Sequence, residues 1–155
     1  MAKTFFYRNN RAESGISLME LLIVIAIIGI ISLIGLPVYK NISPNITLNA
    51  SVRDMASDLR YAQQLTVTEQ KMYSVRFNAL DNSYYIFQVN SGAVVKSRNI
   101  NSQVRISAIT GLSSSTATFT VTGASVESGE ISLVNTNNKT NIIEIKPSGY
   151  VKIQN

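Results

Sequence analysis

The feature of the sequence that most constrains its fold is an apolar run over residues 16–36. Glu20 is the one ionisable residue in this run. The other interruptions are polar or glycine residues, namely Ser17, Gly29, Ser32 and Gly35. As a helix the run is roughly 31 Å long, close to the thickness of the hydrocarbon core of a bilayer. Because lipid offers no partners to backbone N–H and C=O groups, we expect a membrane-spanning helix.

Composition excludes several classes of function. The chain of 155 residues has no His and no Cys, so it has no Cys–His or Ser–His–Asp nucleophile and no imidazole or thiolate metal ligand. We therefore expect no metal, no cofactor and no enzymatic activity. The formal net charge is a modest +5. The closest approach to a basic stripe is Lys96, Arg98 and Arg105, which we interpret as a solvated face rather than a nucleic-acid surface.

The segment before the apolar run, residues 1–15, is short, polar and basic. Positive charge on this side predicts a cytoplasmic N-terminus and a body outside the membrane. An ordinary signal peptide is one alternative, but Pro37 follows the run directly and leaves poor cleavage sites there. A plain anchor is the other alternative. A plain anchor gives no reason for Glu20 to be present. A carboxylate near the centre of a membrane helix makes insertion less favourable by about 2.5–3.5 kcal/mol, and by less near an end.

Residues 14–22, Ser-Gly-Ile-Ser-Leu-Met-Glu-Leu-Leu, resemble the prepilin signature of type IV pilins and type II secretion pseudopilins. The resemblance implies that a prepilin peptidase cuts after Gly15 and that Ile16 becomes the N-methylated terminus. Glu20 is then the fifth residue of the mature chain, where the family carries an acid. Pro37 falls where many members carry a helix-bending proline. Ile16 is a departure, because Phe is usual at that position.

In a filament of this family, the apolar helices pack side by side. Glu20 of one subunit would then pair with the new α-amino group on Ile16 of its neighbour. A buried ion pair of this kind sets register more reliably than it adds net stability. The alternative for Glu20 is a carboxylate that extends to the lipid headgroups.

The chain after the apolar run divides into residues 37–71, an amphipathic continuation of the helix, and residues 72–155, an antiparallel β domain. Ser43-Pro44 predicts a break, followed by a helix over residues 45–70. Its apolar stripe, which we expect to pack on a sheet with Asp54 and Asp58 off it, is Leu48, Val52, Met55, Leu59 and Ala62.

Alternation with a period of two begins at Tyr73 and predicts seven or eight strands. The predicted strands span residues 73–78, 84–89, 93–98, 103–109, 117–122, 131–135, 141–146 and 150–153. The fold class is therefore α+β: a long N-terminal helix, membrane-spanning in its first half and amphipathic in its second, packed on an antiparallel sheet domain.

The body is similar to the GspH/FimT-type minor pseudopilins over residues 58–64, 75–77, 84–86 and 143–151, and it also resembles minor pilins of competence filaments. These likenesses imply a low-copy structural subunit whose partners are the prepilin peptidase, other pilin or pseudopilin subunits and the cytoplasmic membrane. One alternative is a competence-type minor pilin whose body binds DNA during uptake, and another is a major pilin. Tyr73, Tyr84 and Tyr85 are the aromatic residues that such a DNA-binding body would stack on bases, although strand aromatics are more often core.

Overall fold

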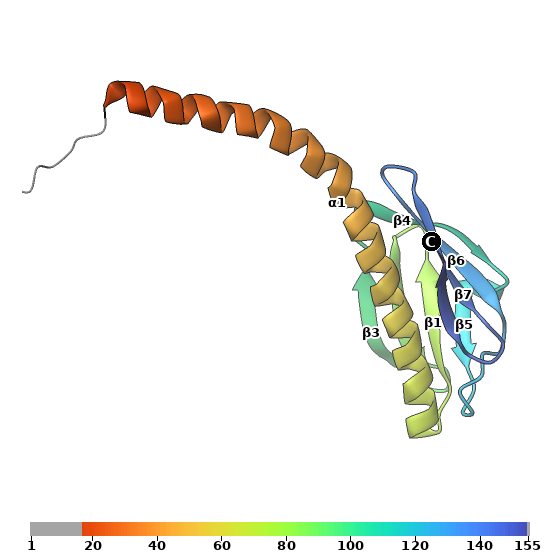
Figure 1. Ribbon diagram of the computed structural model, residues 1–155. Helices are drawn as coiled ribbons and strands as arrows, with labels where there is room; N and C mark the ends of the chain where they lie inside the picture. The colour runs from red at the N-terminus through yellow and green to blue at the C-terminus, as the bar shows by residue number, and fades with distance from the viewer. Residues whose placement is uncertain (1–16, 155) are drawn as a thin grey trace, which may run out of the picture. The chain divides into compact units, whose positions relative to one another are not determined.

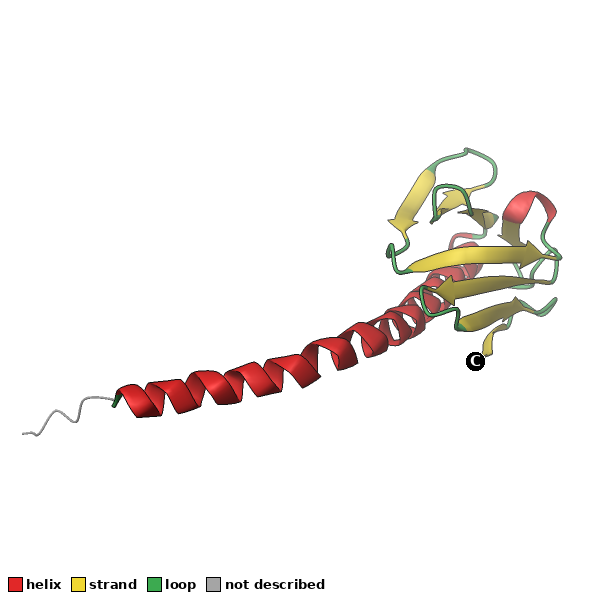
Figure 2. Cartoon of the chain, turned by 90° about the horizontal axis from the view of Figure 1, so that it is seen from above, coloured by secondary structure: helices red, strands yellow, loops and turns green. Residues whose placement is uncertain are grey.

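The structure, a computed structural model, describes residues 17–154, with the side chains of residues 34–41 left out (Figure 1). The chain divides into two units, Met1–Val38 and Tyr39–Asn155. One helix, α1 (Leu18–Glu69), contributes to both. The strands lie beside the C-terminal half of this helix (Figures 1 and 2).

In the first unit, the described side chains of residues 17–33 are all exposed. The exposed fraction reaches 75% at Leu18 and 78% at Leu33. Backbone hydrogen bonding begins at once, with the N–H of Leu21 donating to the carbonyl of Ser17 at 3.1 Å. A helix that is apolar on all sides buries little of its surface by itself.

The helix does not break at Ser43-Pro44, so this prediction was wrong. α1 continues through Pro44, and the proline side chain is buried. Close by, Thr47 Oγ1 donates to the carbonyl of Ser43 at 2.9 Å and contacts Gln103 Oε1 at 3.0 Å. These packing and polar contacts offset the backbone bond that proline removes. The helix ends where Gln70 adopts a left-handed φ of 53°.

The predicted apolar stripe on the helix is confirmed as core. Its members, Leu48, Val52, Met55, Leu59 and Ala62, are each at most 1% exposed. They form one cluster with inward-facing residues of the strands, including Val75, Ile86, Phe119, Ile131 and Ile143. Burial of this face, rather than helix propensity, holds the second half of α1 in place.

The strands form two four-stranded antiparallel sheets. The first has the order β3-β2-β1-β5 and contains β1 (Tyr73–Asn78), β2 (Ser83–Gln88), β3 (Val94–Asn99) and β5 (Thr116–Phe119). The second has the order β4-β6-β7-β8 and contains β4 (Val104–Thr110), β6 (Gly129–Asn135), β7 (Thr140–Ile145) and β8 (Val151–Gln154). A short 3₁₀ helix, η1 (Ser113–Ser115), precedes β5. The eight predicted strands are confirmed to within a few residues.

The side chain of Asn82, in the turn before β2, joins the two sheets. Its Nδ2 donates to the carbonyl of Val104 at 2.7 Å, and its Oδ1 accepts from the N–H of Ile106 at 3.1 Å. Both partners are backbone groups of β4. Asn82 thereby provides hydrogen-bond partners for two backbone groups of the edge strand β4, next to the segment that connects β3 to β4.

Two turns, one containing Gly123 and the other Gly149, lie against Gln63 on α1. Gly149 has a φ of +79°, and a Cβ on it would lie 2.0 Å from the carbonyl oxygen of Gly123. That same carbonyl accepts a hydrogen bond from Gln63 on α1. A glycine is required at position 149 both by the backbone conformation and by this close approach.

Candidate functional site

The predicted processing residues, Gly15 and Ile16, lie outside the described residues. Glu20 lies in the first turn of α1, and its side chain is exposed. Among the described side chains, those of residues 17–33 and 42–154, no ion pair involves Glu20. Its neighbours along the helix are the exposed Met19 and Leu21. An exposed carboxylate among exposed apolar side chains is available to a group from outside this chain.

Among the described residues, no helix is both long and apolar enough to cross a membrane.

Pro37 lies within α1, in the stretch whose side chains are left out. The boundary between the two units falls one residue later, between Val38 and Tyr39. The helix bend expected at Pro37 stays a prediction.

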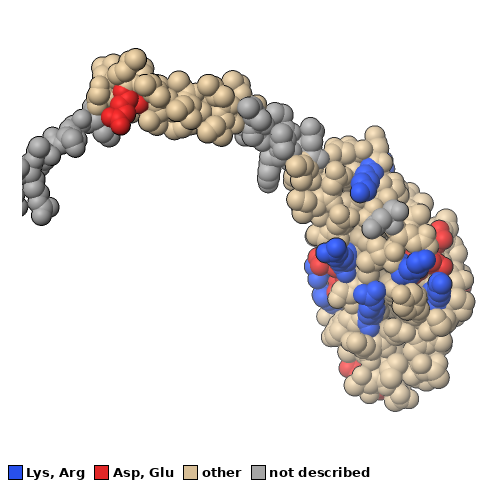
Figure 3. Space-filling view, viewed as in Figure 1, with Lys and Arg blue, Asp and Glu red and all other residues tan. Residues whose placement is uncertain are grey.

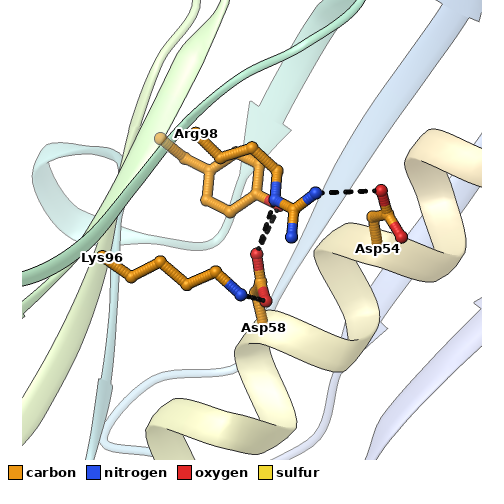
Figure 4. A network of polar contacts seen from close by, with 5 residues as sticks. Asp54, Asp58, Lys96 and Arg98 are labelled. Atoms are coloured by element: carbon orange, nitrogen blue, oxygen red, sulfur yellow. Dashed lines mark hydrogen bonds and ion pairs between the residues drawn. The ribbon is translucent and has the colours of Figure 1, made fainter.

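A polar cluster that the sequence did not reveal lies between α1 and the edge strand β3 (Figure 4). Asp58 on α1, which the sequence placed only off the apolar stripe, is 3% exposed. Its Oδ1 accepts from Lys96 Nζ at 2.6 Å and its Oδ2 from Arg98 Nε at 3.0 Å. Tyr84 OH donates to Oδ2 at 2.9 Å. Arg98 Nη1 also reaches the exposed Asp54, one helical turn away, at 3.1 Å.

Each side chain that binds the Asp58 carboxylate lies on a β-strand, Lys96 and Arg98 on β3 and Tyr84 on β2. Lys96 and Arg98 are two residues apart on β3, so both point to the helix side of the sheet. Burial, followed by the hydrogen bond to Asp58, raises the pKa of Tyr84 well above its usual range. With three donors bound, the carboxylate is not a free general base. It fastens β3 to α1, and charged side chains that point inward also protect an edge strand from pairing with other chains.

The cluster changes the interpretation of the basic residues. Lys96 and Arg98 are neutralised by Asp58 and Asp54 instead of facing solvent as free cations. Arg105 on β4 is exposed. Figure 3 shows Lys and Arg side chains spread over the visible face of the body, with acidic side chains beside some of them. The described residues therefore do not gather the three cations into a stripe.

Of the three tyrosines considered for base stacking, Tyr73 and Tyr84 are core residues, 4% and 2% exposed. Tyr85 is half-buried and lies on the outer face of β2. Groups of three or more His, Cys, Asp or Glu that would suit a metal do not occur in the described part of the chain.

The comparisons with known proteins give a match to a family profile and matches to solved structures. The family profile described as the prokaryotic N-terminal methylation motif matches residues 10–36. Among solved structures, the type IV minor pilin FimU of Pseudomonas aeruginosa is 15% identical, with a TM-score of 0.57, 70% of this chain covered and 88% of that one. The minor pseudopilin EpsH of Vibrio cholerae is 8% identical, with a TM-score of 0.58, 68% of this chain covered and 94% of that one. No curated protein sequence matches the chain significantly.

Proposed function

We infer that this chain, which carries the prepilin-type methylation motif and has the body fold of minor pilins and pseudopilins, is a minor structural subunit of a type IV pilus or a type II secretion pseudopilus. The observation that carries this inference is the exposed apolar helix of residues 18–33, which is joined to a body with its own core. Such a helix has no stable state alone in water. A filament supplies other helices to cover it.

We further propose the processing that the motif implies. A prepilin peptidase cuts between Gly15 and Ile16, and the new α-amino group is methylated. Before assembly the apolar helix resides in the cytoplasmic membrane, with its N-terminus on the cytoplasmic side and the body outside. The basic residues of the leader support this orientation. The assembled subunit then lies in an extracytoplasmic filament. The chain has a structural role rather than an enzymatic one.

Glu20 is the proposed assembly residue. Its carboxylate pairs with the terminal amine of a neighbouring subunit once the helices are bundled, because a charge in that environment requires a partner. The exposure of Glu20 in the isolated chain supports this role.

The test is to replace Glu20 with Gln, which keeps the side-chain shape and removes the charge. We expect Glu20→Gln to enter the membrane and be cut normally but to be absent from sheared filaments. Asp54→Asn, at an exposed carboxylate of the body, is the matched control and should assemble as the native chain does. Native levels of Glu20→Gln in filaments would refute the pairing.

The DNA-binding alternative receives no support from the body. Two of the three cations considered for it are bound to carboxylates, and two of the three tyrosines are buried. If DNA were the ligand, affinity would fall steeply as salt is raised. We expect the purified full chain to show no such affinity at low salt.

A further inference from the structure

The outer face of the first sheet carries an arginine above a pair of aromatic rings. Arg76 on β1 is exposed, and its Cζ lies 5.4 Å from the centroid of the Phe87 ring. The Tyr85 and Phe87 rings are 5.6 Å apart. Strand register pairs Arg76 with Tyr85, and Phe87 with Val94 at the edge strand β3. An irregularity in the β2–β3 pairing between Ile86 and Phe87 separates Val94 from the alternation of Lys96 and Arg98. The four residues Arg76, Tyr85, Phe87 and Val94 line one surface, which we name the Arg76 platform.

The platform borders an open hollow of about 400 Å³, whose lining also includes Gly92 and Ser97. Val94 is 57% exposed, an unusual position for an aliphatic side chain on an edge strand. Gly92 has no atom within 4 Å of the place where a Cβ would lie. The hollow is therefore accessible from solvent and is partly apolar.

In the described part of the chain, no acidic side chain balances the charge of Arg76. Its Nε donates to Thr116 Oγ1 at 3.2 Å and its Nη1 to Tyr85 OH at 3.4 Å, and both acceptors are neutral hydroxyls. No ion pair involves Arg76 among the side chains that the structure describes, which excludes residues 34–41. A guanidinium beside an aromatic ring is well suited to bind a carboxylate with two parallel hydrogen bonds.

The surroundings favour a single carboxylate over a polyanion. The neighbouring cations on β3, Lys96 and Arg98, point to the opposite side of the sheet and are bound to Asp58. Nucleic acid gains affinity from several neutralised phosphates, which this face does not provide. An apolar or aromatic group beside the carboxylate would cover Phe87 and Val94.

We propose that the Arg76 platform binds a neighbouring pilin-like subunit through a surface carboxylate that is flanked by an aromatic or aliphatic side chain. The carboxylate is inferred from the charge of Arg76, and its apolar neighbour is inferred from Phe87 and Val94 beside that arginine. Its identity as a filament neighbour rests on the proposed function.

The experiment uses the ¹⁵N-labelled full chain in detergent micelles and a probe of the proposed chemistry, 3-phenylpropionate. The matched probe is 3-phenylpropionamide, which has the same ring and no charge. We expect the acid to shift backbone resonances of β1 and β2 around Arg76 and to bind about fivefold more tightly than the amide. Arg76→Gln should abolish this difference, whereas Arg105→Gln, at an exposed cation on β4, should keep it.

Equal binding of acid and amide, or no shift at the platform up to the solubility limit of the acid, would overturn the proposal. Preference for oligothymidylate over the acid at physiological salt would also overturn it, because it would assign the surface to nucleic acid. Filament incorporation of the native chain is scored separately. Its absence alongside intact acid binding counts against the proposed function and leaves the carboxylate site standing.

Discussion

The carboxylate of Asp58 gives the sharpest test of how the body is held together. In Asp58→Asn the side chain keeps its size but loses its charge, which leaves Lys96 and Arg98 without their buried counter-ion. Removing one partner of a buried ion pair typically costs 3–5 kcal/mol. Lys96 and Arg98 are each 38% exposed, so water recovers part of this loss. We therefore expect the free energy of unfolding to fall by about 2–3 kcal/mol.

The assay is urea unfolding of the full chain in detergent, followed by the near-ultraviolet circular dichroism of its tyrosines. Asp54→Asn is the matched control, because Asp54 also binds Arg98 but is 57% exposed. Its loss should cost less than about 0.5 kcal/mol. If the two variants lose the same small amount of stability, Asp58 does not fasten β3 to the helix and the reasoning is refuted.

Two further predictions concern the tyrosine and glycine contacts of the body. The pKa of Tyr84 is raised in the folded state, so the stability it contributes is complete below pH 10 and is lost as the pH rises above that value. The free energy of unfolding should fall more steeply above pH 10 in the native chain than in Tyr84→Phe, and equal slopes would contradict this. Gly149→Ala should destabilise by more than about 2 kcal/mol, because its Cβ would clash with the carbonyl of Gly123. Gly92→Ala, at a similar positive φ but in open space, should cost only about 1 kcal/mol, and equal losses in urea unfolding would exclude the clash.

Periodicity predicted the parts of the fold in which a local pattern coincides with burial. The stripe from Leu48 to Ala62 repeats at three and four residues, and it is the buried face of α1. The strands follow from alternation that begins at Tyr73. Each of these signals is contained in a short stretch of sequence, because the same side of the element faces the core throughout.

The features that sequence did not predict depend on contacts between distant residues. The burial of Asp58 could not be predicted, because a hydrophobic pattern cannot show that its partners lie 38 and 40 residues later on β3. A signal was present, since Lys96 and Arg98 occupy alternate positions of one strand and Asp58 directly precedes a core residue, Leu59. The contact by which Asn82 joins the two sheets reaches the backbone of β4, 22 and 24 residues later, which no local pattern encodes.

At Pro44 a local signal was present but gave the wrong prediction. Its local chemistry predicts a helix break, but burial against the body keeps α1 continuous. The candidate assembly residues depend on a motif rather than on geometry, because Gly15 and Ile16 lie outside the described residues.

The mass of the chain recovered from native filaments tests the central claim most directly. The account predicts a polypeptide that lacks residues 1–15, begins at Ile16 and carries one additional methyl group on its N-terminus. A filament-derived chain that begins at Met1, or at a residue beyond Leu36, would contradict it.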